Sequence, residues 1–442
     1  MRRFVVFGAA LLMTACGSGA VGSTASLVPS TAAATPTSTA PASAATSTTT
    51  TRPPTTTTGA RATSTTAAST TAVATSTTSA PSTSTPAPAT STPSTSSTPS
   101  TPSTSATGVG DPYAAFDEVV REATVGAGAR AVSVALARDG VVVHAMAAGT
   151  ADPSDGEQAT VFSRFRIASI SKVLTSVVVL QLVEEGRLGL DEPVAAYLSA
   201  HLGVEPADPR IADVTVRQML SHTSGFPQAE NFYFADSSTI ACPDAGRAAL
   251  GSWLERDPGS HFQYSNTNFC LLGLLIERIV GAPYEEIVRE RLAPLGIQSV
   301  DLVGTYETPD GGAVHPARPG RSFMEALGAA GAWTSTAYDL ALLMSAIDPT
   351  TALPHPLDSA TVAAMRTPVP AIAPGSDWTY GLGLRLWSDG SWGHTGTIEQ
   401  VRAITLVRAD GWTAALLVSG ERPRSDELRA IVAYGLVAAG LA

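Results

Sequence analysis

The stretch Phe165-Arg166-Ile167-Ala168-Ser169-Ile170-Ser171-Lys172 holds the only lysine of the 442 residues; the other 26 of the 27 basic residues are arginine. A buried lysine can lose its proton near neutral pH, whereas an arginine cannot. Ser169 stands three residues before Lys172, so on a helix the hydroxyl and the amine share a face and can meet. A serine beside a proton-accepting lysine is an activated nucleophile. The same spacing arises by chance in roughly one case in ten, so other residues must support the pair.

Two further motifs follow this serine–lysine pair along the chain. Tyr264-Ser265-Asn266 precedes an apolar segment, residues 268–280, that we expect to form a helix ending at Gly281. His394-Thr395-Gly396-Thr397 is expected to open the strand that begins near Val401. Each triplet has a chance frequency of roughly a few per cent in a domain of this length. All three in this order therefore indicate one site.

With these motifs the chain resembles the serine hydrolases that include class C β-lactamases, low-molecular-mass penicillin-binding proteins and related esterases. Their pattern is Ser-x-x-Lys, then Tyr-x-Asn, then Lys- or His-Thr-Gly. Matching stretches extend over the domain, at residues 220–226 and 329–336 among others. Residues 264–269, residues 380–385 and His394 most resemble secreted D-alanyl-D-alanine carboxypeptidases. The resemblance implies a β-lactamase/transpeptidase-like fold and a serine acyl-enzyme.

The resemblance assigns the reacting groups. Ser169 would be the nucleophile, at a helix start whose free N–H groups and positive dipole end favour developing negative charge. Lys172 and Tyr264 would transfer protons, with either a neutral lysine or a phenolate taking the serine proton. Asn266 would hydrogen-bond the substrate amide and help orient Lys172.

The resemblance also assigns the groups that bind the substrate. The backbone N–H groups of Ser169 and Thr397 would form an oxyanion hole, which can contribute several kcal/mol at the transition state. Arg385 and Thr395 would receive the terminal carboxylate of the substrate, a task that suits the guanidinium fork. His394 would have an electrostatic role in the place where other members of the family carry lysine.

Several of these residues have a structural alternative. Tyr264 can be an ordinary half-buried tyrosine, His394 a structural strand residue, and Arg385 a solvated strand residue. His222, in the matching stretch 220–226, is expected to be structural rather than catalytic. Glu399 departs from the carboxypeptidases, which more often carry glycine and aromatic residues there, and this leaves the preferred acyl donor open.

The apolar pattern predicts an α+β domain, in which an antiparallel sheet flanked by helices is built from both ends and accompanies an all-α lobe. An apolar run over residues 131–148, broken by Asp139-Gly140, predicts one hairpin. Residues 401–407 and 413–418, which flank Asp410-Gly411, predict a second.

Further elements follow from the same pattern. Residues 380–387 are expected to form a single strand. Residues 169–185 are apolar nearly all round and stop at Gly186, as expected for a central buried helix. Residues 428–437 predict a terminal helix with Ser425 as its N-cap.

The N-terminus resembles a bacterial lipoprotein signal. Met1-Arg2-Arg3 and a short apolar run, residues 4–13, precede Cys16, which would be lipidated; a plain secretory signal is the alternative. Residues 17–108 are almost entirely Ser, Thr, Pro and Ala and are expected to form a disordered tether. Its many serine and threonine hydroxyls can accept O-glycosylation. Residues 109–442 would be one globular unit.

Composition limits the partners. The formal charge of −11 argues against nucleic acid or an anionic membrane face. Cys242 and Cys270 can form a disulfide in an exported protein, although the sequence does not show that they meet. The histidines lack the spacing of metal ligands, so no metal or cofactor is expected. The domain contains no Gly-x-Ser-x-Gly motif, which argues against an α/β-hydrolase.

Together these features predict an exported, lipid-anchored, monomeric serine hydrolase on the outer face of the cell membrane, acting on the D-Ala-D-Ala end of peptidoglycan stem peptides. A β-lactamase or broad esterase is the alternative within the same chemistry, since the sequence does not report the deacylation rate. A penicillin- or wall-binding module with little turnover is the alternative from another class. The intact Ser169, Lys172, Tyr264 and Asn266 speak against that alternative.

Overall fold

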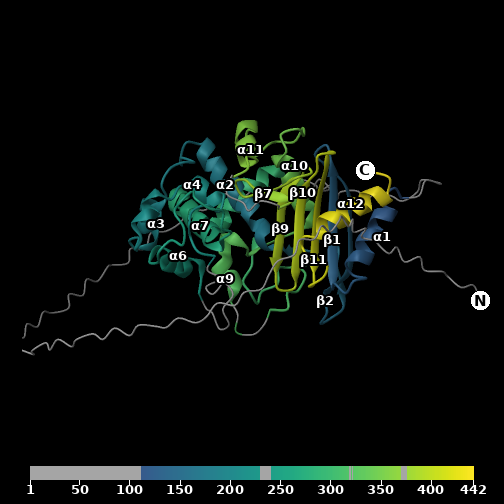
Figure 1. Ribbon diagram of the computed structural model, residues 1–442. Coiled ribbons are helices and arrows are strands. Elements are labelled where there is room, and N and C mark those ends of the chain that lie inside the picture. The colour runs from purple at the N-terminus through teal and green to yellow at the C-terminus, as the bar shows by residue number, and fades with distance from the viewer. Residues whose placement is uncertain (1–110, 229–239, 318–319, 321, 370–375) are drawn as a thin grey trace, which may run out of the picture. The chain divides into compact units, whose positions relative to one another are not determined.

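An eight-stranded antiparallel sheet forms the centre of the domain (Figure 1). The computed structural model describes residues 111–228, 240–317, 320, 322–369 and 376–442. The predicted signal peptide, Cys16 and the predicted tether lie outside these residues. The strand order is β3-β2-β1-β11-β10-β9-β8-β7. In chain order the strands are β1 (Ala131–Arg138), β2 (Val141–Asp152), β3 (Glu157–Gln158), β7 (Trp378–Tyr380), β8 (Arg385–Trp387), β9 (Trp392–Ile398), β10 (Val401–Val407) and β11 (Trp412–Ser419).

The two predicted hairpins are confirmed. Asp139 and Gly140 have φ values of 51° and 83°, the left-handed conformations that a tight turn between β1 and β2 requires. The turn between β10 and β11 contains Gly411, with a φ of 85°. Strand β11 pairs with β1 from Ala131↔Ser419 onward, which joins the two ends of the domain in one sheet.

The prediction of one strand over residues 380–387 is wrong. The segment is the turn of a hairpin between β7 and β8, in which the Gly381 N–H donates to the Leu384 carbonyl. A Cβ at Gly381 would lie 2.1 Å from the Met365 carbonyl oxygen, and one at Gly383, where φ is +78°, would lie 1.9 Å from Ser176 Oγ. Both glycines therefore serve the close packing of this turn and not an extended strand.

The third motif also lies elsewhere than expected. His394 to Thr397 belong to β9, a strand of their own that runs antiparallel to β10, and do not open the strand at Val401. The intervening reversal includes Gln400, with a φ of 58°.

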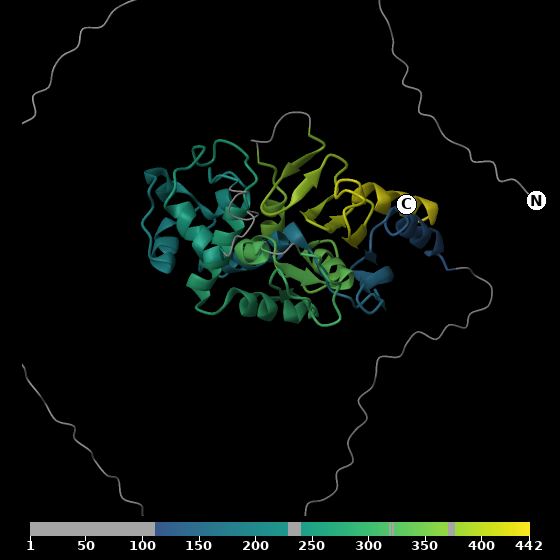
Figure 2. The same ribbon diagram turned by 90° about the horizontal axis from the view of Figure 1, so that it is seen from below.

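Helices cover both faces of the sheet (Figures 1 and 2). One face packs against α1 (Ala114–Ala123) and α12 (Leu428–Ala438), and the other against α10 (Ala337–Ile347). Strand β1 is buried on both faces, with Val132, Val134 and Leu136 toward α1 and α12 and the small Ala131 and Ala135 on the opposite side. This alternation explains why the strand reads as a continuous apolar run.

Ser425 is not the N-cap of the terminal helix. Helix α12 begins at Leu428, and its preceding residue makes no side-chain cap. The Ser425 hydroxyl instead lies 2.8 Å from the Gly396 carbonyl and 2.6 Å from Thr397 Oγ1. It therefore fixes the end of β9 in place of capping the helix.

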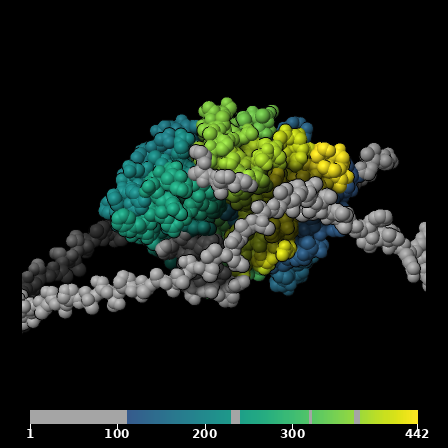
Figure 3. Space-filling model, in the orientation of Figure 1, coloured from purple at the N-terminus to yellow at the C-terminus, as the bar shows by residue number. Residues whose placement is uncertain are grey.

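The predicted all-α lobe adjoins the sheet, as the teal surface of Figure 3 and the helices of Figure 1 show. Its central helices are α2 (Ser171–Glu184) and α7 (Asn266–Val280), and α7 ends at left-handed Gly281, with a φ of 83°. Around them lie α3 (Ala195–Leu202), η2 (Pro209–Asp213), α4 (Val216–Leu220), α6 (Cys242–Leu250), α8 (Tyr284–Leu292), η3 (Ala293–Leu295), α9 (Phe323–Leu327), η4 (Gly328–Ala330) and α11 (Ser359–Met365).

Two further features fix the lobe. A small sheet joins β4 (Phe165–Arg166), β6 (Trp333–Ser335) and β5 (Asp301–Leu302). A disulfide joins Cys242 to Cys270, with 5.7 Å between the Cα atoms, and so ties α6 to α7. Among the described residues, no helix combines the length and the apolar character that crossing a membrane requires.

Candidate active site

Ser169 lies in a short 3-10 turn, η1 (Ala168–Ile170), between β4 and α2. The Ile167 N–H donates to the Trp333 carbonyl, which anchors the turn to β6. Ala168 has a φ of 47°, a left-handed conformation that is strained for a residue with a Cβ. Ser169 is half-buried between fully buried neighbours. The turn thus presents this one hydroxyl at the start of a buried helix.

Lys172 is fully buried and lies directly beside the serine. Its Nζ is 3.2 Å from Ser169 Oγ, 2.9 Å from Asn266 Oδ1 and 2.7 Å from the Ala330 carbonyl oxygen. Burial, together with the charge of Arg385, lowers the pKa of Lys172 well below the ordinary value of a lysine. A neutral amine has two N–H groups, which the two acceptor oxygens occupy, and its lone pair then faces the serine hydroxyl.

Tyr264 adjoins both the serine and the lysine, and its ring centre lies 5.0 Å from Lys172 Nζ. Burial raises the pKa of Tyr264 to about 12, although a hydrogen bond with Ser169 and the charge of Arg385 oppose the shift. The tyrosine is therefore a phenol at neutral pH and can donate a proton. Of the two bases that the sequence left open, the electrostatics favour the neutral lysine.

Strand β9 packs against the nucleophile turn. A Cβ at Gly396 would lie 2.3 Å from the Ile167 carbonyl oxygen, so only glycine permits this approach of two backbones. The approach places Thr397, which is exposed, next to the turn that carries Ser169. Thr395 is buried two residues earlier on the same strand.

Arg385 is half-buried at the start of β8 and has no hydrogen-bond or ion-pair partner among the described residues. Its guanidinium carbon lies 4.5 Å from the centre of the Trp378 ring. Its charge lowers the pKa of Lys172 and of His394. The guanidinium is therefore a cation of the site, and its buried Nε has no hydrogen-bond partner in the described part of the chain.

His394 is fully buried and neutral. Its Nδ1 lies 2.7 Å from the Thr395 carbonyl oxygen, which can only accept, so Nδ1 carries the hydrogen. Its Nε2 then accepts from the Tyr380 hydroxyl at 2.9 Å. Burial, followed by the charges of Arg385 and Lys172, lowers the pKa of His394 well below its ordinary value. It does not replace the positive charge of a lysine.

The structure brings together seven of the eight residues predicted for the site, namely Ser169, Lys172, Tyr264, Asn266, Arg385, His394 and Thr397. The eighth, Thr395, is buried on β9, and no side-chain contact with the reacting groups is seen among the described residues. Sequence reasoning missed three contributions, namely the Ala330 carbonyl, the Tyr380 hydroxyl and the contact of His222 with Tyr264. All three residues lie in stretches that match the family, but the resemblance assigns no role to Ala330 or Tyr380 and leaves His222 with an expected structural role only. In the described part of the chain, no group of three or more His, Cys, Asp or Glu side chains could hold a metal ion.

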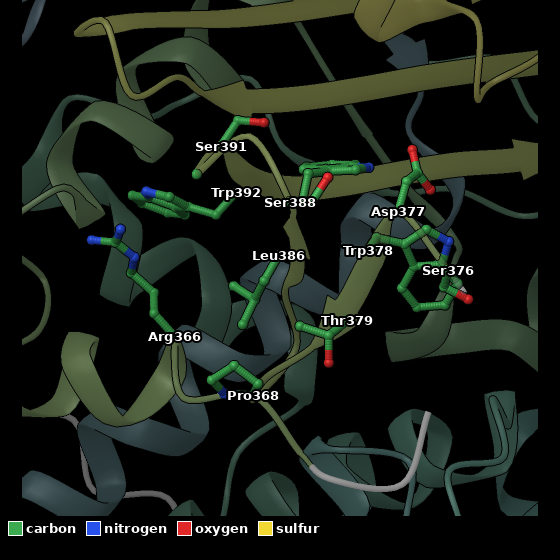
Figure 4. Close-up of a pocket in the computed structure, with 12 residues that line it drawn as sticks. Arg366, Pro368, Ser376, Asp377, Trp378, Thr379, Leu386, Ser388, Ser391 and Trp392 are labelled. Atoms are coloured by element: carbon green, nitrogen blue, oxygen red, sulfur yellow. The ribbon is translucent and has the colours of Figure 1, made fainter. Parts of the chain in front are cut away.

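A cavity of about 350 Å³ lies at the far end of the β7–β8 hairpin from its turn (Figure 4). Arg366 and Trp392 line one side, Trp378 lines the other, and Leu386 lies between them. Ser169, Lys172 and Tyr264 do not line it. This cavity is therefore separate from the reacting groups.

Comparison with known protein sequences gives a consistent result. Residues 116–439 match the family model described as Beta-lactamase. FimD (serogroup D) of Dichelobacter nodosus, named as a fimbrial assembly protein, is 34% identical over 182 residues, which are 40% of this chain and 44% of FimD. PbpX of Bacillus subtilis (strain 168), whose name places it among the penicillin-binding proteins, is 26% identical over 298 residues, 64% of this chain and 69% of PbpX. The chain thus spans less than half the length of FimD.

Solved structures share the fold. The D-amino acid amidase from Ochrobactrum anthropi SV3 superposes with a TM-score of 0.60 at 26% identity and covers 73% of this chain and 97% of its own. A D-stereospecific amidohydrolase from Streptomyces sp. gives a TM-score of 0.57 at 26% identity, with 71% and 97% covered. A family model that spans nearly the whole described domain, and a fold that agrees with it, show that the chain belongs to the beta-lactamase family of serine hydrolases.

Proposed function

We propose that this serine hydrolase is a D-alanyl-D-alanine carboxypeptidase acting on peptidoglycan stem peptides. The observation that carries the proposal is the guanidinium of Arg385, whose charge acts on Lys172 and His394 and which has no ion-pair or hydrogen-bond partner within the described ranges. An unpaired, half-buried cation calls for an anionic ligand, and a carboxylate can accept both arms of the guanidinium fork. A substrate that ends in a free carboxylate fits this site better than a neutral amide or ester.

The first half of the reaction forms the acyl-enzyme. Lys172 Nζ takes the proton from Ser169 Oγ as the oxygen attacks the carbonyl carbon of the penultimate D-Ala. The backbone N–H groups of Ser169 and Thr397 stabilise the resulting oxyanion. The Lys172 ammonium, which burial and Arg385 destabilise, passes its proton through the Tyr264 hydroxyl to the departing amine of the terminal D-Ala. The carbon–nitrogen bond then breaks, and free D-Ala leaves.

The second half reverses these roles. Neutral Lys172 takes a proton from water, whose oxygen attacks the Ser169 ester. The ester oxygen leaves with a proton returned from the lysine, which restores the serine hydroxyl. The shortened peptide dissociates as a carboxylic acid, so the atoms balance as hydrolysis of one amide bond.

The experiment offers the full chain three substrates: a peptide ending in D-Ala-D-Ala, the same peptide with its terminal carboxylate amidated, and a penicillin. Release of D-Ala and the intact mass over time are recorded for the wild type and Ser169→Ala. We expect preferred cleavage of the free-acid peptide and a long-lived penicillin adduct, both absent in Ser169→Ala. Equal cleavage of the amidated peptide would contradict the carboxypeptidase assignment.

D-amino acid amide hydrolysis is the second candidate, because the superposed amidase and amidohydrolase act on D-configured compounds by name. Fast turnover of D-amino acid amides with no cleavage of the D-Ala-D-Ala peptide would favour it. Fast penicillin hydrolysis without a lasting adduct would instead identify a β-lactamase.

We further propose that the protein is a monomer and that it is exported and anchored through Cys16; export and anchoring are supported by the N-terminal sequence alone. Two or more acyl chains at this position would hold the protein stably at a membrane. Cys16→Ser is expected to move the protein from the membrane fraction to the medium. Unchanged membrane association of that variant would refute lipid anchoring at this cysteine.

A further inference from the structure

His222 contacts both sides of Tyr264 along the chain. Its backbone carbonyl accepts the Gln263 N–H at 2.8 Å, and its ring Nδ1 lies 3.2 Å from the Ser265 nitrogen. The two amides that flank Tyr264 therefore both donate to one residue. The His222 ring also lies against the Tyr264 ring, with 4.2 Å between the ring centres and 35° between the planes.

The protonation state of His222 follows from its partners. The Ser265 backbone N–H can only donate, so Nδ1 must accept and Nε2 must carry the hydrogen. Asn268 Nδ2 also lies 3.2 Å from Nδ1, and its Oδ1 accepts from the Ser224 hydroxyl at 2.6 Å, which orients this amide as a second donor. His222 thus has the opposite tautomer to His394.

The backbone at His222 is shaped for this contact. Its φ of 57° is left-handed, a conformation that is costly for most residues. The same stretch continues to Gly225, where a Cβ would lie 2.1 Å from the Arg256 carbonyl oxygen. The loop therefore packs closely against the Arg256 backbone, and its strained residue, His222, is the one that contacts Tyr264.

We propose that His222 is a positioning residue for acylation, because it clamps the segment from Gln263 to Ser265 and so fixes Tyr264 and Asn266 relative to Ser169. The proposal rests on the proton-transfer role of Tyr264 proposed above. Asn266 shares the effect, since it directly follows the clamped Ser265 and accepts from Lys172 at 2.9 Å.

The clamp requires a neutral imidazole. The charged and titratable groups that face His222 are Lys172 from α2, Arg385 from β8, His394 from β9, and the rings of Tyr264 and Tyr380. Burial, followed by the charges of Lys172, His394 and Arg385, lowers the pKa of His222 well below its ordinary value. A proton on Nδ1 would face the Ser265 N–H and abolish the bond.

Two substitutions separate the acceptor from the backbone requirement. Asparagine and glycine both tolerate the left-handed conformation. Only asparagine keeps an acceptor, because its Oδ1 is the same number of bonds from the backbone as Nδ1 of histidine. His222→Asn and His222→Gly therefore differ mainly in the bond to Ser265. His315→Ala, which removes another buried histidine, is the matched control.

The measurement is the acylation of the full chain by a fluorophosphonate, which reports Ser169 reactivity for any substrate class, and by a fluorescent penicillin. We expect His222→Gly to lower the acylation rate constant about 10²-fold, the scale of a 1 Å misplacement, with His222→Asn restoring it to within about 10-fold of wild type. The initial binding constant of the penicillin should change little. His315→Ala should react like the wild type.

The proposal would be overturned if His222→Asn and His222→Gly lowered the acylation rate constant equally and this loss followed the decrease in their thermal midpoints. That result would show a purely structural role. Unchanged rates in His222→Gly would also overturn the proposal. If His222→Gly does not fold, a rate for His222→Asn more than about 100-fold below wild type overturns it. A wild type that reacts with the fluorophosphonate but neither with penicillin nor with D-Ala-D-Ala peptide refutes the proposed function and leaves this comparison decisive for His222.

Discussion

At the scale of single residues, the chemistry depends on a lysine that is neutral and on an arginine that has no ion-pair partner among the residues that the structure describes. Lys172 is surrounded by two acceptor oxygens and the serine, and no carboxylate is among the groups that shift its pKa. His394 is neutral, held by Tyr380 and its own neighbour's carbonyl. Arg385 is then the cation that faces the site permanently. One amine serves as the base and one guanidinium as the anion receptor.

Lys172→Arg tests the requirement for a neutral amine. Arginine keeps the positive charge but offers no lone pair to the Ser169 hydroxyl. We expect the acylation rate constant to fall about 10²- to 10⁴-fold, the range of general-base catalysis. Stopped-flow measurement with a fluorescent penicillin checks this. Near-normal acylation would show that Lys172 is not the proton acceptor.

Arg385→Gln tests the carboxylate receptor. We expect kcat/KM for the free-acid peptide to fall about 10- to 100-fold, which corresponds to the loss of a charged hydrogen bond worth about 1.5–3 kcal/mol. Removing this charge also raises the pKa of Lys172, so the acid limb of the pH profile should move to higher pH. The amidated peptide provides the control, and an equal loss for both peptides would argue against carboxylate binding.

At the scale of elements, the sequence predicted what a local pattern encodes and failed where packing decides. The hairpin at Asp139-Gly140 followed from turn chemistry, and α2 and α7 followed from apolar runs ending in glycine. The prediction of a strand over residues 380–387 was wrong because Gly381 and Gly383 pack closely against Met365 and Ser176, which are distant in sequence. The prediction of Ser425 as an N-cap was wrong for the same reason, since its hydroxyl bonds to Gly396 of β9. Motifs placed the reacting residues, but the neutral state of His394 depends chiefly on burial, which only the fold produces.

Gly396→Ala tests whether β9 must lie against the nucleophile turn. The added Cβ would meet a backbone oxygen, that of Ile167, which cannot move aside as a flexible side chain can. We expect β9 to shift and the acylation rate constant to fall about 10²-fold. Gly251→Ala is the matched control, because its Cβ would be 3.3 Å from the nearest atom. Equal rates in the two variants would contradict a role for this close approach.

At the scale of the whole molecule, the buried imidazoles couple the fold to pH. His222, His394 and His315 are all held neutral chiefly by burial, and each lies near positive charges. Two belong to the site and one, His315, lies near Arg166 and Arg130 in a different part of the domain. The burial that keeps these three histidines neutral therefore also makes the folded state sensitive to acid.

The sign of this coupling can be worked out for His315, whose pKa burial and the two arginines lower from 6.5 to about 3. Between these pH values the unfolded chain binds a proton that the folded chain does not, so stability is complete above pH 6.5 and is lost as the pH falls. One such group lowers the free energy of unfolding by about 2 kcal/mol at pH 5. His315→Phe should therefore reduce the loss of stability between pH 7 and pH 5, as measured by urea unfolding, whereas His261→Phe at an exposed loop position should not. An unchanged loss in His315→Phe would show that this histidine is not kept neutral by the fold.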